Sequence, residues 1–217
     1  MLMIDLEMIV SYNSVMNQKP EAPVGPGRPR EFDTNAALNK AIIRFSEYGY
    51  HGTSISDLNA CLGLTSGSIY KAWGDKRGLF LAALDRYMTQ RSEAIAACLA
   101  NELSGKDKIE VLLNQFAQLS SEGAGRTGCL VIESAVELAL ADNEISDLIA
   151  VQQTKREKQL LHLIEEGQTD GSIQKGINAA SMAKLLLALQ QGMRILGKTG
   201  SDTKTMVGMV AELTRLL

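Results

Sequence analysis

Residues 66–80, SGSIYKAWGDKRGLF, place three cations among apolar and aromatic side chains in a chain of formal net charge −3. The cations are Lys71, Lys76 and Arg77. Ammonium and guanidinium groups bind phosphate oxygens, and apolar residues between them can fix a helix on a core. This combination indicates a segment that is buried on one face and meets a polyanion with the other.

The charge is unevenly distributed along the chain. Residues 27–91 hold nine Lys and Arg against six Asp and Glu, a balance of +3, whereas residues 92–217 hold twelve against sixteen, a balance of −4. Since a polyanion is attracted by a local excess of positive charge, only the first of these regions is suited to bind one.

The composition excludes several classes of protein. Of the 217 residues, 45% are hydrophobic and 22% are charged, which is typical of a globular protein. The three cysteines, Cys61, Cys98 and Cys129, form no CxxC pair, so we expect neither a disulfide framework nor a metal site, and a reducing cytoplasm fits best. No stretch is long and uncharged enough to span a bilayer, so no membrane contact is expected.

Residues 1–26 are not expected to carry function. Their apolar start is interrupted by Asp5 and Glu7 and is not preceded by Lys or Arg, unlike a secretory signal. The following PEAPVGPGRPR is rich in Pro and Gly. We interpret residues 1–26 as a flexible leader, or as the product of an upstream start codon chosen in error.

The segment that positions the cations has the signals of short helices. An amphipathic helix is predicted from Asp33 to Gly49. Thr53 or Ser54 can cap a second helix that Gly63 ends, and Thr65 can cap a very short third one. Two short helices joined by a tight turn that contains glycine, between longer helices, indicate a helix-turn-helix, whose second helix enters a DNA major groove.

The rest of the chain also has the apolar period of helices and no alternating strand pattern, which predicts an all-α fold. A fourth helix is expected from Asp75 to about Leu103. Further helices are predicted over about 108–121, 129–141, 144–166, 178–197 and 203–217.

Residues 49–80, GYHGTSISDLNACLGLTSGSIYKAWGDKRGLF, resemble the DNA-binding domain of the TetR family of bacterial transcriptional repressors. The resemblance covers roughly residues 33–88 and rests on the joint spacing of Phe45, Gly49, Tyr50, Thr53, Gly63, Gly67, Tyr70, Lys76 and Phe80. It implies a helix-turn-helix DNA-binding domain at 27–88 and a larger helical ligand-binding and dimerisation domain at 89–217. It also implies a homodimer that is joined through its last two long helices, binds a palindromic operator and releases it when a small ligand enters.

The DNA contacts are predicted from these residues. Lys76 in a first helical turn is disfavoured by the helix dipole, so a phosphate contact is preferred over a solvated lysine. Ile69 is assigned to the core and Tyr70 to the DNA backbone, or Tyr70 packs locally. Gly67 permits close approach to the duplex or merely starts the helix. The further candidates, which have hydroxyl or ammonium groups, are Thr53, Thr65, Ser66, Ser68 and Lys71.

An arm is predicted ahead of the first helix. In Gly27-Arg28-Pro29-Arg30 the proline prevents a helix, and Arg28 and Arg30 can enter a narrow A/T minor groove. A solvated tail is an equal alternative.

The C-terminal half has one aromatic residue after Tyr87, which is Phe116. A cavity lined mainly by Leu, Ile and Met, for a small inducer of aliphatic type, is therefore expected rather than one for flat multi-ring compounds. The candidate pocket residues are Phe116, Cys129, Ile132, Met182 and Leu186. The candidate dimer interface consists of Leu189, Gly192, Met193, Met206, Val210 and Leu213, where thioethers adapt their shape and Gly192 permits close approach.

Three other functions were weighed. A DNA-binding adaptor or organiser would share the helix-turn-helix without ligand control. A redox or electrophile sensor would use Cys129 or Cys98, whose thiols are more simply explained as buried. An enzyme is not expected, because His51 and His162 are the only histidines and no phosphate loop, dinucleotide fingerprint or nucleophile elbow occurs. Glu133 and Glu137 with His162 would make a poor metal site. No cofactor is expected.

Overall fold

The computed structural model describes residues 32–99 and 103–217, and within these ranges the chain is helical and contains no strand. The predicted all-α fold is therefore confirmed. The leader and the two arginines of the predicted arm, Arg28 and Arg30, lie outside the described residues.

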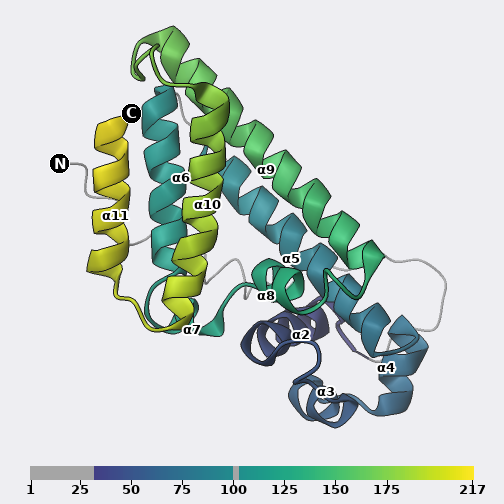
Figure 1. The fold of residues 1–217 in the computed structure, drawn as a ribbon. Coiled ribbons are helices and arrows are strands. Elements are labelled where there is room, and N and C mark those ends of the chain that lie inside the picture. The colour runs from purple at the N-terminus through teal and green to yellow at the C-terminus, as the bar shows by residue number, and fades with distance from the viewer. Residues whose placement is uncertain (1–31, 100–102) are drawn as a thin grey trace. The chain divides into compact units, whose positions relative to one another are not determined.

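The helices follow one another with short connections, and Figure 1 shows their arrangement. In chain order they are α2 (Thr34–Tyr48), α3 (Ile55–Leu62), α4 (Ser66–Trp73), α5 (Lys76–Cys98), α6 (Gly105–Leu119), α7 (Glu122–Thr127), α8 (Leu130–Glu137), α9 (Asn143–Asp170), α10 (Ala179–Lys198) and α11 (Thr203–Leu216).

Several helix boundaries differ from the sequence prediction, and one helix was missed. Helix α5 ends at Cys98 and not near Leu103. Helix α8 ends at Glu137, because the chain turns to Asp142, whose side chain caps α9 by accepting a hydrogen bond from the Ile145 N–H. Helix α7 was missed, since its sequence EGAGRT has two glycines and no apolar stripe to signal a helix.

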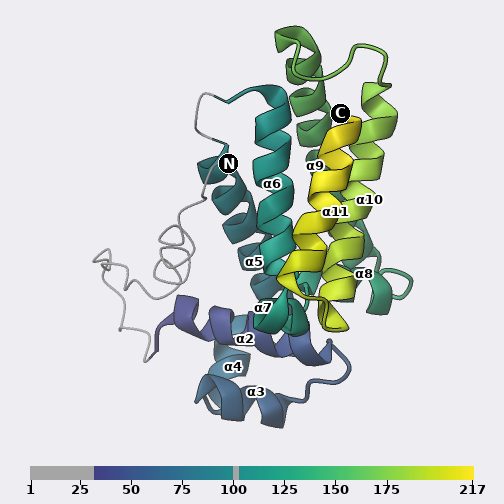
Figure 2. The same cartoon turned by 90° about the vertical axis from the view of Figure 1, so that its left-hand side faces the viewer.

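Helices α2, α3 and α4 pack together with the start of α5 (Figure 2). Their core is built on Phe45, Leu58, Ile69 and Phe80, each at most 1% exposed. The rings of Phe45 and Phe80 meet edge to face, with centroids 5.0 Å apart. Such a pair adds about 0.5–1.5 kcal/mol to the stability that burial alone gives.

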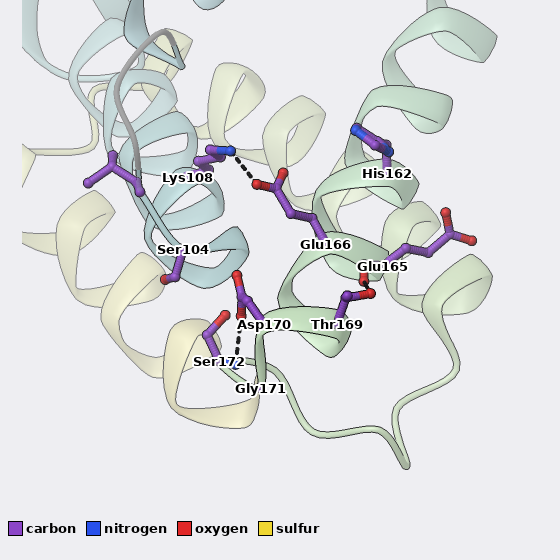
Figure 3. Close-up of a pocket in the computed structure, with 10 residues that line it drawn as sticks. Ser104, Lys108, His162, Glu165, Glu166, Thr169, Asp170, Gly171 and Ser172 are labelled. Atoms are coloured by element: carbon purple, nitrogen blue, oxygen red, sulfur yellow. Dashed lines mark hydrogen bonds and ion pairs between the residues drawn. The ribbon is translucent and has the colours of Figure 1, made fainter.

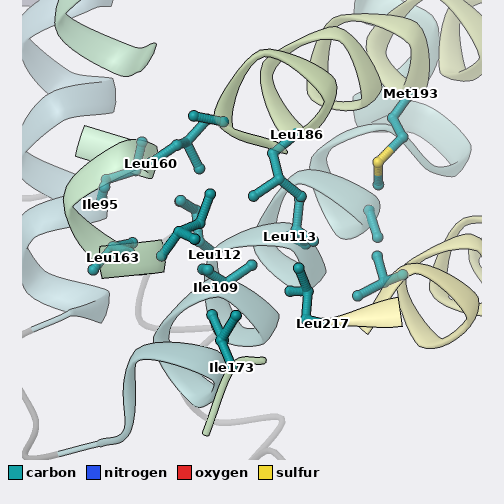
Figure 4. Packing of buried hydrophobic residues seen from close by; sticks show 14 of the residues in the cluster. Ile95, Ile109, Leu112, Leu113, Leu160, Leu163, Ile173, Leu186, Met193 and Leu217 are labelled. Atoms are coloured by element: carbon teal, nitrogen blue, oxygen red, sulfur yellow. The ribbon is translucent and has the colours of Figure 1, made fainter. Parts of the chain in front are cut away.

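A second core lies among the C-terminal helices (Figure 4). Leu112 and Leu113 of α6 meet Leu160 of α9 and Leu186 of α10, and all four are fully buried. Both α10 and α11 pack on α6. The predicted domain boundary after residue 88 falls inside α5, whose residues belong to both cores, and it stays a prediction.

None of the helices in the described ranges combines the length and the apolar character needed to cross a membrane.

Candidate nucleic-acid interface and ligand cavity

The connection between α3 and α4 is fixed by the caps that the sequence predicted. Ser54 and Asp57 form a capping box at the start of α3. Gly63 ends α3 with φ 69°, a left-handed conformation that glycine adopts without strain. Thr65 then caps α4 by accepting a hydrogen bond from the Ser68 N–H at 3.2 Å. The two helices are thereby held as a helix-turn-helix.

The outer face of α4 carries Gly67, Tyr70 and Lys71, all exposed, with Tyr70 at 47%. Ile69, the neighbour of Tyr70, is fully buried as expected. A Cβ added to Gly67 would meet only the Thr65 hydroxyl, at 3.9 Å. Within the described part of the chain nothing bonds the Tyr70 hydroxyl or the Lys71 ammonium. These three residues are called the α4 outer face below.

The hydroxyl groups at the tip of α4 are used inside the protein. Asn59 Nδ2 donates to Ser66 Oγ at 2.8 Å, which joins α3 to α4. The hydroxyls of Thr65 and Ser68 share a hydrogen bond of 3.0 Å. Thr65 is exposed, whereas Ser66 and Ser68 are half-buried. These hydroxyl groups can therefore bind DNA only through donors or lone pairs that their hydrogen bonds within the protein do not use.

The prediction for Thr53 was wrong. Its side chain is fully buried, and its hydroxyl donates to the Gly49 carbonyl at 2.8 Å. Its backbone N–H is bonded to the Tyr50 carbonyl. Ser54, and not Thr53, caps α3, so Thr53 holds the turn from within and has no group left for DNA.

Lys76 stabilises the turn between α2 and α3, a structural role that was not predicted from the sequence. Its Nζ donates to the carbonyls of Tyr50 and Thr53, both at 3.0 Å, and lies 4.1 Å from the centre of the Tyr50 ring. Burial raises the pKa of the Tyr50 hydroxyl, and the charge of Asp75 adds to the shift. An ammonium has three donors, so one remains for a phosphate.

The N-terminal helices are tied to the C-terminal ones by charged contacts that sequence reasoning missed. The Glu137 carboxylate accepts from the N–H groups of Tyr50 and His51, both at 2.7 Å. Lys198 of α10 donates to the Ser46 carbonyl at 3.1 Å and pairs with Glu133. Glu133 and Glu137 are thus structural. Their contacts lie too far apart in sequence for any local pattern to signal them.

Arg77, which had no assigned role, joins the same junction. Its guanidinium makes two bonds to the Asp142 carboxylate, at 2.8 and 3.0 Å, and one to Glu144 at 2.6 Å. The hydrogen bonds from Arg77 lower the pKa of Asp142. The start of α5 is therefore held to the start of α9, and Arg77 is committed to carboxylates rather than to phosphate.

A cavity of about 230 Å³ lies among α5, α6, α8, α9 and α10. Three of the predicted pocket residues, Phe116, Cys129 and Ile132, line it. The other two do not, because Leu186 is fully buried in the C-terminal core and Met182 packs against that core.

The cavity has a mainly apolar surface, with polar side chains among its lining residues. Its wall has an apolar part, but arginine and glutamine supply seven of its lining residues, which are Arg91, Gln152, Gln153, Arg156, Gln190, Gln191 and Arg194. The mainly apolar lining agrees with the expectation, but the count of aromatic residues carried no information on which polar side chains the helices turn inward. The Tyr87 hydroxyl donates to Cys129 Sγ at 3.3 Å, and burial, with the Cys129 thiol adding, raises the pKa of Tyr87 to about 12.

A second hollow, open to solvent, lies between the start of α6 and the end of α9 (Figure 3). Several of its polar groups are already paired. Lys108 forms an ion pair with Glu166, and Asp170 accepts from the N–H groups of Gly105 and Ser172, both at 2.8 Å. In the described ranges no group of three or more His, Cys, Asp or Glu side chains is arranged to hold a metal ion.

Half of the predicted dimer interface is buried inside the subunit. Met193, Met206 and Val210 are at most 1% exposed and belong to the C-terminal core, so they cannot meet a second chain. Leu189 and Leu213 pack partly against that core. Gly192 borders open space. The exposed apolar positions on these helices are instead Leu185, Ile195, Leu196, Val207 and Leu216.

Two family models match the chain. Residues 37–83 match the model described as bacterial regulatory proteins, tetR family, and residues 105–211 match the model described as the tetracyclin repressor-like C-terminal domain. The first covers α2 to the start of α5, and the second covers the cavity helices from α6 onward.

Relatives match over most of their length. The uncharacterized HTH-type transcriptional regulator YezE of Bacillus subtilis (strain 168) is 29% identical over 177 residues, 81% of this chain and 91% of the relative. The HTH-type transcriptional repressor ComR of Escherichia coli (strain K12) is 28% identical over 193 residues, 88% of this chain and 91% of the relative.

Solved structures share the fold. The TetR family regulator CifR, a cysteine mutant complexed with double-strand operator DNA, superposes with a TM-score of 0.77 at 23% identity over 87% of this chain and 98% of that one. Reduced NemR of E. coli gives 0.72 at 18% identity over 83% and 94%.

Proposed function

The chain belongs to the TetR family of bacterial regulatory proteins, and on this premise we propose that it represses transcription from a palindromic DNA operator as a ligand-responsive homodimer. The family consists of DNA-binding transcription regulators, so the chain is not an enzyme. Repression is proposed because ComR is named a transcriptional repressor. We place the protein in the cytoplasm, where its DNA is.

The observation that carries the proposal is the α4 outer face. Tyr70 and Lys71 are exposed on the second helix of a helix-turn-helix, and no intrachain contact in the described residues explains them. A tyrosine hydroxyl and an ammonium suit phosphate oxygens, which give affinity and register. Gly67 leaves room for the helix to approach the duplex. We propose Thr65, Ser66, Ser68 and Lys76 as further DNA contacts and Arg28 and Arg30 as a minor-groove arm.

The dimer is proposed to form through exposed apolar positions of α10 and α11. Leu185, Leu189, Gly192 and Leu196 recur at helical spacing along α10, and Leu185 is 60% exposed. Val207 and Gly208 supply an exposed stretch on α11. Two subunits joined here would set their α4 helices about 34 Å apart, one turn of DNA, which is the spacing that a palindrome requires.

The dimer is tested with Leu185→Asp, which places a charge in the proposed seam. Sedimentation equilibrium should give monomers for this variant and dimers for Val151→Asp, a control on α9 whose side chain is 68% exposed in the unsubstituted chain. Dimers in both variants would show that the dimer interface lies elsewhere on the subunit.

Ligand control is proposed over the adaptor alternative because of the cavity. An adaptor that ignores ligands needs no buried space with unused hydrogen-bonding groups, yet Gln190 and Arg194, which line this cavity, have buried polar atoms without a partner in the described residues. The cavity and the turn between α2 and α3 are linked through α8. Ile132 of α8 lines the cavity, and Glu137 at the end of α8 accepts the hydrogen bonds of that turn. A ligand that shifts α8 would shift the helix-turn-helix.

A second candidate function rests on Cys129. Its thiol lines the cavity and accepts a hydrogen bond from Tyr87, so an electrophile that enters the cavity can reach it. Burial raises the pKa of Cys61 and of Cys98, which disfavours their thiolates. Mass spectrometry after mild oxidation or alkylation distinguishes this function: an unmodified Cys129 with unchanged DNA affinity would exclude it.

The DNA-binding proposal is tested by comparing Tyr70→Ala with Tyr48→Ala. Tyr48 of α2 is as exposed as Tyr70, 54% against 47%, and does not lie on the α4 outer face. Fragments bound in genome-wide mapping supply the operator, and fluorescence anisotropy measures its affinity. We expect about tenfold weaker binding to all sequences for Tyr70→Ala, since one phosphate contact is lost, and little change for Tyr48→Ala. Equal affinities in the two variants would contradict the proposed face.

A further inference from the structure

The cavity contains buried polar groups whose hydrogen-bonding capacity is unused. Gln190 is 1% exposed and Arg194 is 5% exposed, and both line the cavity. Neither amide atom of Gln190, nor Nη1 of Arg194, has a partner in the described part of the chain. Buried polar groups are normally bonded, so three unpartnered atoms at one cavity indicate that a polar ligand completes them.

Two cations of the cavity, Arg156 and Arg194, form no ion pair with a carboxylate of the described residues. No Asp or Glu side chain of the described residues lines the cavity, whereas Arg156 and Arg194 do. Arg156 Nη1 donates to Gln159 Oε1 at 2.8 Å, and its guanidinium carbon lies 5.8 Å from the Phe116 ring centre. Burial, with the charge of Arg91, lowers the pKa of Arg156 to about 10. The guanidinium therefore stays cationic at neutral pH, but its burial costs free energy in the unliganded protein.

We propose that the cavity binds a small monocarboxylate with an apolar body, its carboxylate facing Arg156, Arg194 and the Gln190 amide. This inference rests on the proposed function, whose ligand it defines. Guanidinium forks match the planar carboxylate. Phe116, Ile132 and Leu187 supply the apolar wall, which inorganic phosphate would leave unfilled. The volume of about 230 Å³ exceeds the ~150 Å³ that holds a benzene, so it suits a single ring or a short alkyl chain.

Arg194 gives the ligand a direct path to the DNA-binding helices. Its Nη2 donates to the Gly128 carbonyl. Gly128 lies against the end of α2, where an added Cβ would be 3.0 Å from the Ser46 carbonyl oxygen. Lys198, one turn beyond Arg194, bonds that same Ser46 oxygen. A carboxylate that engages Arg194 competes with the Gly128 carbonyl and so loosens the support of α2.

The test is calorimetric titration of the full chain, without DNA, using benzoate and hexanoate against benzamide and hexanamide. We expect the acids to bind and the amides, which have the same shape without the charge, to bind at least about tenfold more weakly. Arg156→Met should weaken benzoate binding about thirtyfold or more, because the carboxylate loses a desolvated partner. Lys155→Met, which removes an exposed charge from the neighbouring position of α9, should leave binding unchanged.

Thermal unfolding without ligand separates binding from folding. Replacing an uncompensated buried charge by an apolar side chain should leave the melting temperature of Arg156→Met unchanged or higher. A lower melting temperature would give Arg156 a structural role and overturn the inference. Equal binding of acid and amide would also overturn it, and so would the absence of binding of either acid at millimolar concentration. Loss of acid binding with intact DNA binding would contradict this inference alone. DNA that fails to bind, with acid binding intact, would contradict the proposed function alone.

Discussion

Among the described residues, Lys71 of the α4 outer face and Arg194 of the cavity form no ion pair, but the surroundings of these two cations differ. Lys71 is exposed, so water solvates its ammonium and the free protein loses nothing by leaving it unpaired. Arg194 is 5% exposed, so its unpartnered Nη1 is a free-energy cost to the unliganded fold. The first arrangement suits a large polyanion that arrives from outside, and the second suits a small anion that replaces missing hydrogen bonds.

Lys76 stands between these extremes, because its ammonium is bonded to backbone carbonyls at the edge of the DNA-binding helices. We predict that Lys76→Met lowers the free energy of unfolding by about 2–3 kcal/mol, since it removes two hydrogen bonds from a charged donor. Lys71→Met should change it by less than about 0.5 kcal/mol, as a substitution in solvent does. Urea denaturation without DNA measures both.

The same pair of variants separates affinity from folding. Lys71→Met should weaken DNA binding and lower the slope of log K against log salt by about 0.9, the value for one phosphate contact. Unchanged stability of Lys76→Met would mean that its carbonyl bonds contribute nothing, and Lys76 would then join the α4 outer face as a free cation.

Glu137 connects the two regions, and its substitution is expected to have the next largest effect. In Glu137→Gln the amide retains one oxygen acceptor, while its NH₂ group faces an N–H donor. One of the Tyr50 and His51 N–H groups thus loses its partner, so we predict a loss of about 1–2 kcal/mol. Hydrogen exchange should be faster at these two amides. Glu212→Gln, at an exposed carboxylate of α11, should leave both the stability and the exchange unchanged.

The sequence predicted local features well and long-range ones poorly. The caps at Ser54 and Thr65 and the glycine stop at Gly63 depend on neighbouring residues, and they were predicted correctly. The roles of Arg77 and Glu137 depend on partners 65 and 87 residues away, which no local period encodes. Thr53 was misassigned because capping propensity does not decide which of two adjacent hydroxyl residues is buried.

The C-terminal helices illustrate the same limit. Their apolar period predicted the elements, but an apolar stripe faces either the subunit's own core or a second chain, and sequence cannot distinguish these. Met193 and Met206 were therefore placed in a dimer seam although they are fully buried in the subunit. The unpartnered groups of Gln190 and Arg194 became visible only once the surrounding helices were placed.

Gly67→Ala is expected to change the stability by less than Lys76→Met or Glu137→Gln, and in the opposite direction. Inside the protein a Cβ here would meet nothing closer than 3.9 Å, so Gly67→Ala should raise the free energy of unfolding by about 0.5–1 kcal/mol through helix propensity. Gly63→Ala, at φ 69°, should instead lower it by about 1 kcal/mol. If Gly67 is kept for close approach to DNA, the added methyl group should weaken operator binding about tenfold while it stabilises the free protein. Urea denaturation and anisotropy on the same variant measure the two effects. A stabilised variant with full DNA affinity would show that Gly67 only starts the helix, and the α4 outer face would then consist of Tyr70 and Lys71.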